Sequence, residues 1–165
     1  EDFAGAAQHF EKALAAAKAD TFAGEQVATM LGLSMVAYRQ GKFFDAARWN
    51  KEAVELARKL KQASLKRTGV LNEARIRLGQ GDAAGAEPLL RKLVGEAGVS
   101  SQLRWTAHVE LGQLLAGQGR NAMPEFERAM TLLEAGQANL TAAEDRISFV
   151  SGRIAGKNAA SRAPS

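Results

Sequence analysis

The segment GKFFDAARWNKEAV at residues 41–54 decides the fold, because its pattern recurs at regular intervals along the chain. Forty residues earlier, DFAGAAQHFEKAL at residues 2–14 has the same order of small, aromatic and apolar positions. Forty residues later, GDAAGA at residues 81–86 repeats the turn, and a fourth copy runs from QGRNA at 118–122 into FERAM at 126–130. A unit that recurs with a period of about 40 residues is typical of stacked helical repeats.

Between these turns, apolar residues recur every three to four positions, which is the period of a helix with one buried face. The three stripes are Val27, Met30, Leu31, Ser34, Met35 and Tyr38; Val70, Leu71, Ala74 and Leu78; and Leu103, Ala107, Leu111, Leu114 and Leu115. Each unit is therefore expected to be a helix, a tight turn and a second helix, with a longer link to the next unit. We expect an all-α protein of seven or eight helices.

Length and composition fit one compact helical array. The chain has 165 residues, of which 46% are hydrophobic and 24% are charged, with three prolines and no cysteine. These values exclude a disordered or collagen-like chain, and the lack of cysteine excludes disulfides, thiolate metal sites and cysteine nucleophiles. No stretch approaches the ~18 uninterrupted apolar residues that a membrane span needs. The protein is expected in the cytoplasm, without contact with a membrane.

Positive charge is concentrated in one part of the chain. Residues 39–77 contain 11 Lys or Arg and 4 Asp or Glu, a net charge of +7, while the whole chain carries +4. Such a basic stretch attracts an anionic partner, but the solvated faces of helices have the same composition, and both interpretations stay open. Nucleic acid is not the expected partner, because only Phe43, Phe44 and Trp49 are interleaved with these charges.

These repeats resemble the tetratricopeptide repeat (TPR) family, in a long variant with about 40 residues per repeat. The family pattern has Leu-Gly in the first helix, Gly-x-Phe or Gly-x-Tyr at the turn, and a run of spaced Ala and aromatic positions in the second helix. The matching residues are Leu111, Gly112 and Gly119; Gly41, Phe43, Ala46, Ala53 and Val54; and Phe3, Ala6, Phe10, Ala13 and Leu14. The resemblance implies a right-handed α-solenoid of antiparallel helical hairpins over residues 1–137, with only the second helix of the first repeat present.

Two sets of positions are expected to control the packing. The positions where the helices of a hairpin approach most closely are Ala6, Ala46, Ala86 and Ala122. A larger side chain there would push the helices apart. The positions that fill the space between successive units are Phe10, Leu90 and Phe126. Asn50 takes that place in the second copy, which predicts a looser or water-lined contact, with the neighbouring Trp49 turning in to compensate.

The resemblance also implies a partner-binding groove lined by the first helix of each unit. Carried over to this sequence, the groove residues are Leu31, Met35, Tyr38, Arg39, Thr68, Asn72, Arg75, Thr106, Val109 and Gln113. Of these, Tyr38, Arg39 and Arg75 are suited to hold a peptide carboxylate or backbone. The alternative is that Met35 and Tyr38 belong to the core between repeats. Recognition of a chaperone tail is not expected, because Leu31 and Met35 stand where that clamp needs polar groups.

Residues suited to catalysis or cofactor binding are scarce. The two histidines, His9 and His108, are about 100 positions apart and are expected to be packing or surface residues. The acidic residues that recur in the repeats are expected to be solvated; they are Glu11, Glu52, Glu87 and Glu127. No glycine-rich segment has the spacing of a phosphate loop. The sequence therefore predicts neither an enzyme nor a cofactor or metal site, but a scaffold that binds a protein or peptide segment.

The C-terminal part departs from the repeat. Thr141 and Glu144 have the spacing of a capping box, and residues 138–155 are expected to form a helix that caps the array, followed by a flexible tail or linker at 156–165. Residues 144–153 loosely resemble a helix found between TPR arrays and caspase-like (CHAT) peptidase domains. This resemblance implies an alternative function, a regulatory arm of a larger enzyme, in which a neighbouring domain of the same chain is the partner. The sequence predicts no oligomeric state.

Overall fold

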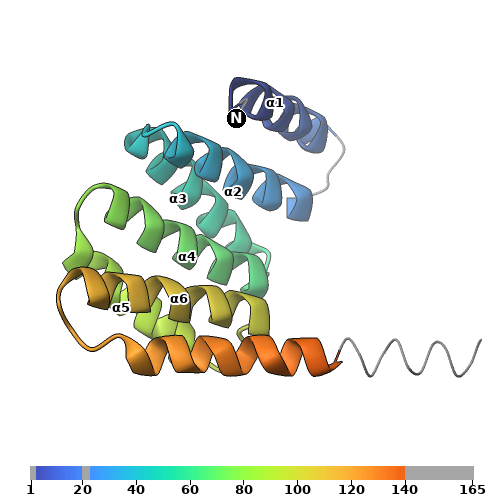
Figure 1. Ribbon diagram of the computed structural model, residues 1–165. Coiled ribbons are helices and arrows are strands. Elements are labelled where there is room, and N and C mark those ends of the chain that lie inside the picture. Colours follow the sequence, from blue (N-terminus) through green and yellow to red (C-terminus); the bar gives the residue numbers. More distant parts are fainter. Residues whose placement is uncertain (1–2, 20–22, 140–165) are drawn as a thin grey trace, which may run out of the picture.

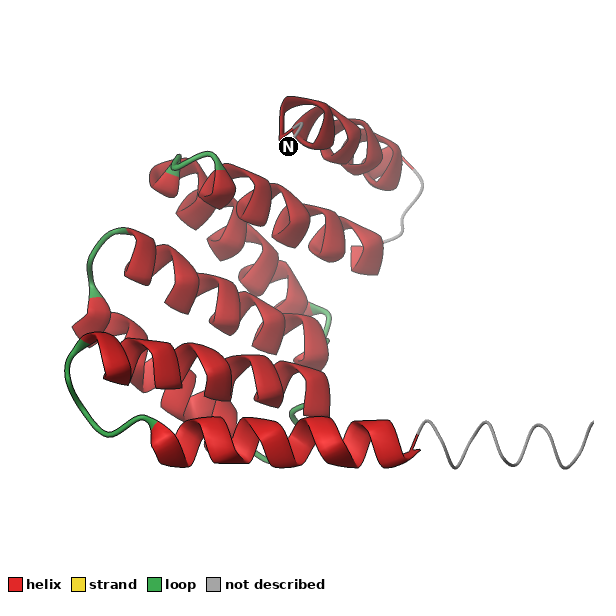
Figure 2. Cartoon of the chain, in the orientation of Figure 1, coloured by secondary structure: helices red, strands yellow, loops and turns green. Residues whose placement is uncertain are grey.

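The computed structural model describes residues 3–19 and 23–139, and these residues are almost entirely helical (Figures 1 and 2). The labelled helices are α1 (Phe3–Ala19), α2 (Ala23–Arg39), α3 (Phe43–Lys59), α4 (Ala63–Gly79), α5 (Ala83–Gly95) and α6 (Ser101–Gly117). A further helix covers residues 123–139, and no strand occurs within the described ranges. The expected tail, residues 144–153 on which the peptidase-arm alternative rests, and all of the expected capping helix except residues 138 and 139 lie outside the described ranges.

The helices follow one another through the molecule in chain order, as the colour sequence of Figure 1 shows. Each helix from α1 to α6 packs against the next one, and α2 also contacts α4. The all-α expectation is therefore confirmed, as are the helix-turn-helix boundaries implied by the recurring turns. The expected longer link between units is wrong at the junction of α3 with α4, because residues 60–62 connect them as tightly as residues 40–42 connect α2 with α3.

One type of cap ends four of the helices. Gly41, Lys61, Gly81 and Gly119 adopt positive φ values of 73°, 56°, 81° and 68°. The amide of the following residue donates to a carbonyl five positions back in each case, for example from Lys42 to Ala37 at 2.9 Å. This Schellman geometry reverses the chain and satisfies carbonyls that the helix end leaves unpaired. Three of the four positions are glycine, because a side chain is strained in that conformation.

The link between α5 and α6 is longer, at residues 96–100, and an arginine from α4 holds it. The guanidinium of Arg67 donates to the Glu96 carboxylate at 2.9 Å and to the carbonyls of Ala97 and Gly98 at 3.0 and 2.9 Å. The Arg67 side chain is only 20% exposed. Because Arg67 is partly buried and makes three hydrogen bonds, it fixes this link against the N-terminal part of α4.

Three of the four alanine positions are buried as expected, while Ala6 is half-buried. Ala46 and Ala86 are fully buried within α3 and α5, and Ala122 is 8% exposed just before the last described helix. The Phe126 ring lies against Gly112 of α6, the preceding helix, and packs against the largest core cluster. A Cβ on Gly112 would come within 2.6 Å of that ring. The glycine therefore allows the close approach of α6 and the last described helix.

Candidate functional site

A cavity of about 350 Å³ opens on the face of the protein that α2, α4 and α6 share. We call it the groove cavity. The residues that line it are Met35, Tyr38 and Arg39 from α2, Arg75 and Leu78 from α4, and Glu110 and Gln113 from α6. Five of the ten expected groove residues thus come together from three alternate helices. The helical period explains this arrangement, since residues three or four positions apart lie on one side of each helix.

Tyr38 has two roles at this cavity. Its ring packs against Phe43 with 5.9 Å between the ring centroids, and both rings join the buried cluster around Ala46 and Ile76. Tyr38 is nevertheless only half-buried and lines the groove cavity, as does the half-buried Met35. For Tyr38, the two interpretations, core between repeats and groove surface, are therefore compatible.

The charged residues of the groove cavity differ in their availability. The Arg75 guanidinium donates to Glu110 Oε1, with 2.6 Å from Nε, so Arg75 is already paired. Glu110 Oε2 is buried without a hydrogen-bond partner, and burial raises the pKa of Glu110 although Arg75 opposes that shift. Arg39, the exposed last residue of α2, makes no ion pair within the described residues. Of the two arginines expected to hold a peptide carboxylate, Arg39 therefore presents an unpaired charge, whereas Arg75 is already paired with Glu110.

The other five expected groove residues do not line this cavity. Leu31 and Asn72 are buried, at 5% and 2% exposed, and the Asn72 amide donates to the Leu31 carbonyl at 3.4 Å. They join α2 to α4, which corrects their expected placement on an accessible surface. Thr68 and Thr106 donate to carbonyls of their own helices, those of Ser64 and Gln102. The remaining residue, Val109, is half-buried.

Sequence reasoning missed Glu110 and Leu78. A signal for Glu110 existed, because it lies four positions after Thr106 and three before Gln113 and so shares their side of the helix. The apolar spacing predicts Leu78 only as a member of the core stripe. Its half-buried side chain in fact contacts the core cluster and also lines the cavity.

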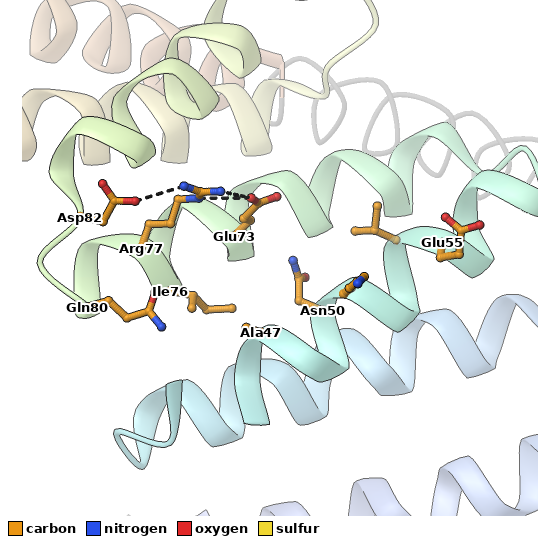
Figure 3. Close-up of a pocket in the computed structure, with 10 residues that line it drawn as sticks. Ala47, Asn50, Glu55, Glu73, Ile76, Arg77, Gln80 and Asp82 are labelled. Atoms are coloured by element: carbon orange, nitrogen blue, oxygen red, sulfur yellow. Dashed lines mark hydrogen bonds and ion pairs between the residues drawn. The ribbon is translucent and has the colours of Figure 1, made fainter. Parts of the chain in front are cut away.

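A second cavity, of about 490 Å³, lies on the other side of α4, and we call it the α3–α4 hollow (Figure 3). Its lining residues are Ala47, Asn50, Lys51, Val54 and Glu55 from α3; Glu73, Ile76, Arg77 and Gln80 from α4 and its cap; and Asp82 before α5. Figure 3 shows Arg77 between Glu73 and Asp82. Its guanidinium donates to them at 2.9 and 3.1 Å.

Asn50 is the buried polar residue among those that line this hollow. It is 4% exposed, its amide nitrogen donates to the Gly69 carbonyl at 2.9 Å, and its Oδ1 has no hydrogen-bond partner. The expected looser contact at Asn50 therefore takes the form of one direct hydrogen bond beside an open space. Trp49 does not line the hollow. It packs against the cluster of α2 and α3, and the Arg48 guanidinium lies 4.5 Å from its ring centroid.

The expectation about Glu87 needs correction, and the expectation about His108 is confirmed. Glu87 is not simply solvated, because it accepts hydrogen bonds from Arg120 and Arg91, which lower its pKa to about 2. His108 is a packing residue with a specific partner, since its Nδ1 lies 2.7 Å from Oε2 of the buried Glu125 in the last described helix. The other three recurring glutamates and His9 are exposed.

The basic stretch 39–77 separates into arginines that form ion pairs and lysines that form none within the described residues. Five arginines form ion pairs with acidic residues: Arg48, Arg58, Arg67, Arg75 and Arg77. Within the described residues, Arg39 and the lysines of this stretch form none. The net charge of +7 is therefore largely carried by flexible lysines at the surface, which attract anions at long range without holding them in one geometry.

Within residues 3–19 and 23–139, no group of three or more His, Asp or Glu side chains is placed to hold a metal ion. The described helices also include none with the length and hydrophobicity of a membrane-spanning segment. No protein-family model matches this sequence, and no curated protein is similar enough to count as a match.

Proposed function

We propose that this protein is an interaction scaffold that binds a peptide or protein segment in the groove formed by α2, α4 and α6. In this proposal the helices form antiparallel hairpins of TPR type that wind into a right-handed solenoid. The observation that supports it is the meeting of Met35, Tyr38, Arg39, Arg75 and Gln113 at one cavity, although they come from three helices separated by others in the chain.

The groove cavity favours a particular kind of segment. Met35, Tyr38 and Leu78 offer half-buried apolar surface, and Arg39 offers an unpaired guanidinium beside it. A carboxylate fits Arg39, because charge-assisted hydrogen bonds to guanidinium are among the strongest available. We therefore propose a segment with an apolar side chain next to an acidic residue.

The test is a selection of binding peptides from a random display library, followed by calorimetric measurement of their dissociation constants. Arg39→Gln should weaken the best peptides by about 1.5–3 kcal/mol, the value of a hydrogen bond to a charged group. Lys59→Gln is the matched control, because Lys59 is exposed at the end of α3 and does not line the groove cavity. Arg75 is unsuited to this test, since its removal would leave Glu110 unpaired.

Three outcomes would contradict the proposal. The selection could enrich no peptide, the enriched peptides could lack acidic residues, or Arg39→Gln and Lys59→Gln could have the same small effect. In the third case the binding would depend on overall charge, and it would weaken equally in both variants as salt is raised.

A further inference from the structure

Two arginine–glutamate bridges cross 35 and 33 positions of the chain, and they hold their carboxylates differently. Arg120 donates one N–H to each oxygen of Glu87, at 2.7 and 3.0 Å, and Arg91 adds a further hydrogen bond. Arg75 instead places both Nε and Nη2 against Oε1 of Glu110, at 2.6 and 2.5 Å. Both oxygens of Glu87 are therefore hydrogen-bonded, whereas Oε2 of Glu110 is buried without a donor.

The charged form of Glu110 is poorly stabilised where it stands. Its side chain is 14% exposed, and a buried acceptor without a donor loses its hydration without gaining a hydrogen bond. Burial accordingly raises the pKa of Glu110, although Arg75 opposes that shift. At the other bridge, Arg120 and Arg91 lower the pKa of Glu87 to about 2. Glu110 therefore loses its charge, and its hold on Arg75, more readily than Glu87 loses its own.

The Arg75–Glu110 pair lies inside the groove cavity. Both residues line it, together with Arg39, which makes no ion pair within the described residues. The Arg75 side chain is 28% exposed, so its guanidinium can be reached from the cavity. Of the described residues, Arg75 from α4 is the charged group that acts on Glu110. Arg39 from α2 lines the same space, and neither α5 nor the last described helix adds a charged residue to this lining.

We propose that Glu110 is an internal competitor for the carboxylate of the partner segment. It occupies Arg75 in the free protein, and Arg75 binds the acidic residue of the partner once Glu110 loses its charge. Because Glu110 is itself a carboxylate, it makes with Arg75 the same kind of contact that the partner would make. This inference rests on the proposed function of the groove, and it adds a second carboxylate-binding residue together with its control.

The expected consequence is binding that becomes tighter in mildly acidic solution. Unperturbed Asp and Glu side chains have pKa values of about 3.9 and 4.3. Since burial raises the pKa of Glu110, Glu110 takes up its proton at a higher pH than an acidic residue of the partner does. Between these two titrations the partner is still charged and Arg75 is released. At lower pH the carboxylate of the partner becomes neutral, and binding weakens again.

The probe is N-acetyl-leucyl-aspartyl-amide, which has an apolar side chain next to an acidic one. Its dissociation constant is measured by NMR titration of the isotope-labelled protein. Glu110→Gln should tighten binding at neutral pH about three- to tenfold, the effect of one charge-assisted hydrogen bond at a partly exposed site. Glu127→Gln is the matched control, because Glu127 is exposed in the last described helix and lies outside the groove cavity. It should leave the dissociation constant unchanged, since salt screens its charge.

Two further measurements separate this mechanism from a general effect of charge. Adding Arg75→Gln to Glu110→Gln should cancel the gain, because the double variant has no guanidinium to release. In the wild-type protein, the Arg75 Nε signal should follow the titration of the Glu110 carboxyl carbon. The dissociation constant of the wild-type protein should pass through a minimum as the pH falls, and Glu110→Gln should remove that minimum.

The inference is overturned if Glu110→Gln binds the probe no more tightly than the wild-type protein, or if the double variant keeps the gain. It is also overturned if the Arg75 signal does not respond to the titration of Glu110. Failure of the proposed function has a different signature, because Arg39→Gln and Lys59→Gln would then have the same small effect on the probe. A clear loss in Arg39→Gln without a gain in Glu110→Gln would reject this inference alone.

Discussion

The junction of α3 with α4 and the junction of α5 with α6 are built from equivalent parts of the repeat, yet their interiors differ. The first helices correspond at a spacing of 38 residues, since α4 is capped at Gln80 and α6 at Gln118. Glu73, Ile76 and Arg77 on α4 therefore correspond to Leu111, Leu114 and Leu115 on α6. The three leucines are buried in one apolar cluster, while Glu73 and Arg77 pair with each other at the edge of a hollow.

This difference shows that successive units of the repeat can pack together through two kinds of interface, one apolar and one polar. At α5–α6, apolar burial dominates, with Leu90, Leu93 and Leu111 fully buried. At α3–α4, one asparagine bonds a neighbouring backbone carbonyl and a glycine allows close contact, because a Cβ on Gly69 would lie 2.2 Å from a methyl carbon of Val54. The second way leaves an open space of about 490 Å³ at the surface.

The largest expected effect comes from making the filled junction resemble the polar one. Leu90→Asn removes a fully buried side chain, which costs about 2–5 kcal/mol for leucine truncations. A buried amide without partners adds about 1–3 kcal/mol. Urea unfolding followed by circular dichroism should show a loss of roughly 4 kcal/mol or more. A loss below about 1 kcal/mol, the usual effect of an average substitution, would mean that both junctions accept a polar residue equally.

A second variant tests the close contact at the polar junction. Gly69→Ala should destabilise the protein by about 1–3 kcal/mol, because the new methyl group overlaps Val54 in a packed interface. Gly95→Ala is the control with the opposite sign: no atom lies within 4 Å of a Cβ there, and alanine favours a helix over glycine by about 0.5–1 kcal/mol. Partial rescue of Gly69→Ala by Val54→Ala would locate the overlap. Equal thermal stability of the two glycine variants would rule out close packing at Gly69.

A smaller effect is expected at the salt bridge that spans the filled junction. Arg120 and Arg91 lower the pKa of Glu87 to about 2 from its ordinary value of 4.5. A lowered pKa in the folded state stabilises the protein above pH 4.5, and this contribution is lost as the pH falls through the range from 4.5 to about 2. Both arginines are about half exposed, so we expect only about 1 kcal/mol after solvent screening. Glu87→Gln should lower stability at pH 7 by that amount and flatten the acid limb of the stability curve. An unchanged acid limb would show that the bridge adds nothing.

The smallest effect is expected from Asn50→Leu, which makes the polar junction resemble the filled one. The variant loses one hydrogen bond but also removes the unpartnered Oδ1 and adds apolar volume beside the hollow. The carbonyl group of Gly69, which loses the Asn50 hydrogen bond, remains part of the backbone of helix α4. We expect a change between zero and a gain of about 1 kcal/mol in the free energy of unfolding. A loss above about 2 kcal/mol would show that the asparagine contributes far more than an average hydrogen bond and that the two junctions are not interchangeable.

The sequence by itself determined the helices, the turns and their period. These features are local: apolar spacing selects the buried side of a helix, and glycine after a helix permits the left-handed turn that ends it. Residues within a few positions of one another supply all the information needed. For the same reason the sequence placed Met35, Tyr38, Arg39, Arg75 and Gln113 on the sides of their helices that meet at one cavity. Lys61 takes the left-handed turn position without being glycine, so the short link between α3 and α4 carried no such signal.

Only the tertiary structure decided which polar groups meet. Arg75 pairs with Glu110 across 35 positions, Arg120 pairs with Glu87 across 33, and the Asn72 amide reaches the Leu31 carbonyl across 41. A long flexible side chain can reach several neighbouring groups. Which of them it binds depends on how far one helix is shifted along the next, by a few ångströms, and a repeat pattern in the sequence does not specify that shift. The α3–α4 hollow has the same origin. The sequence marked Asn50 as different, but an open space beside it depends on how Ala47, Asp82 and the buried surface of α4 are placed around it.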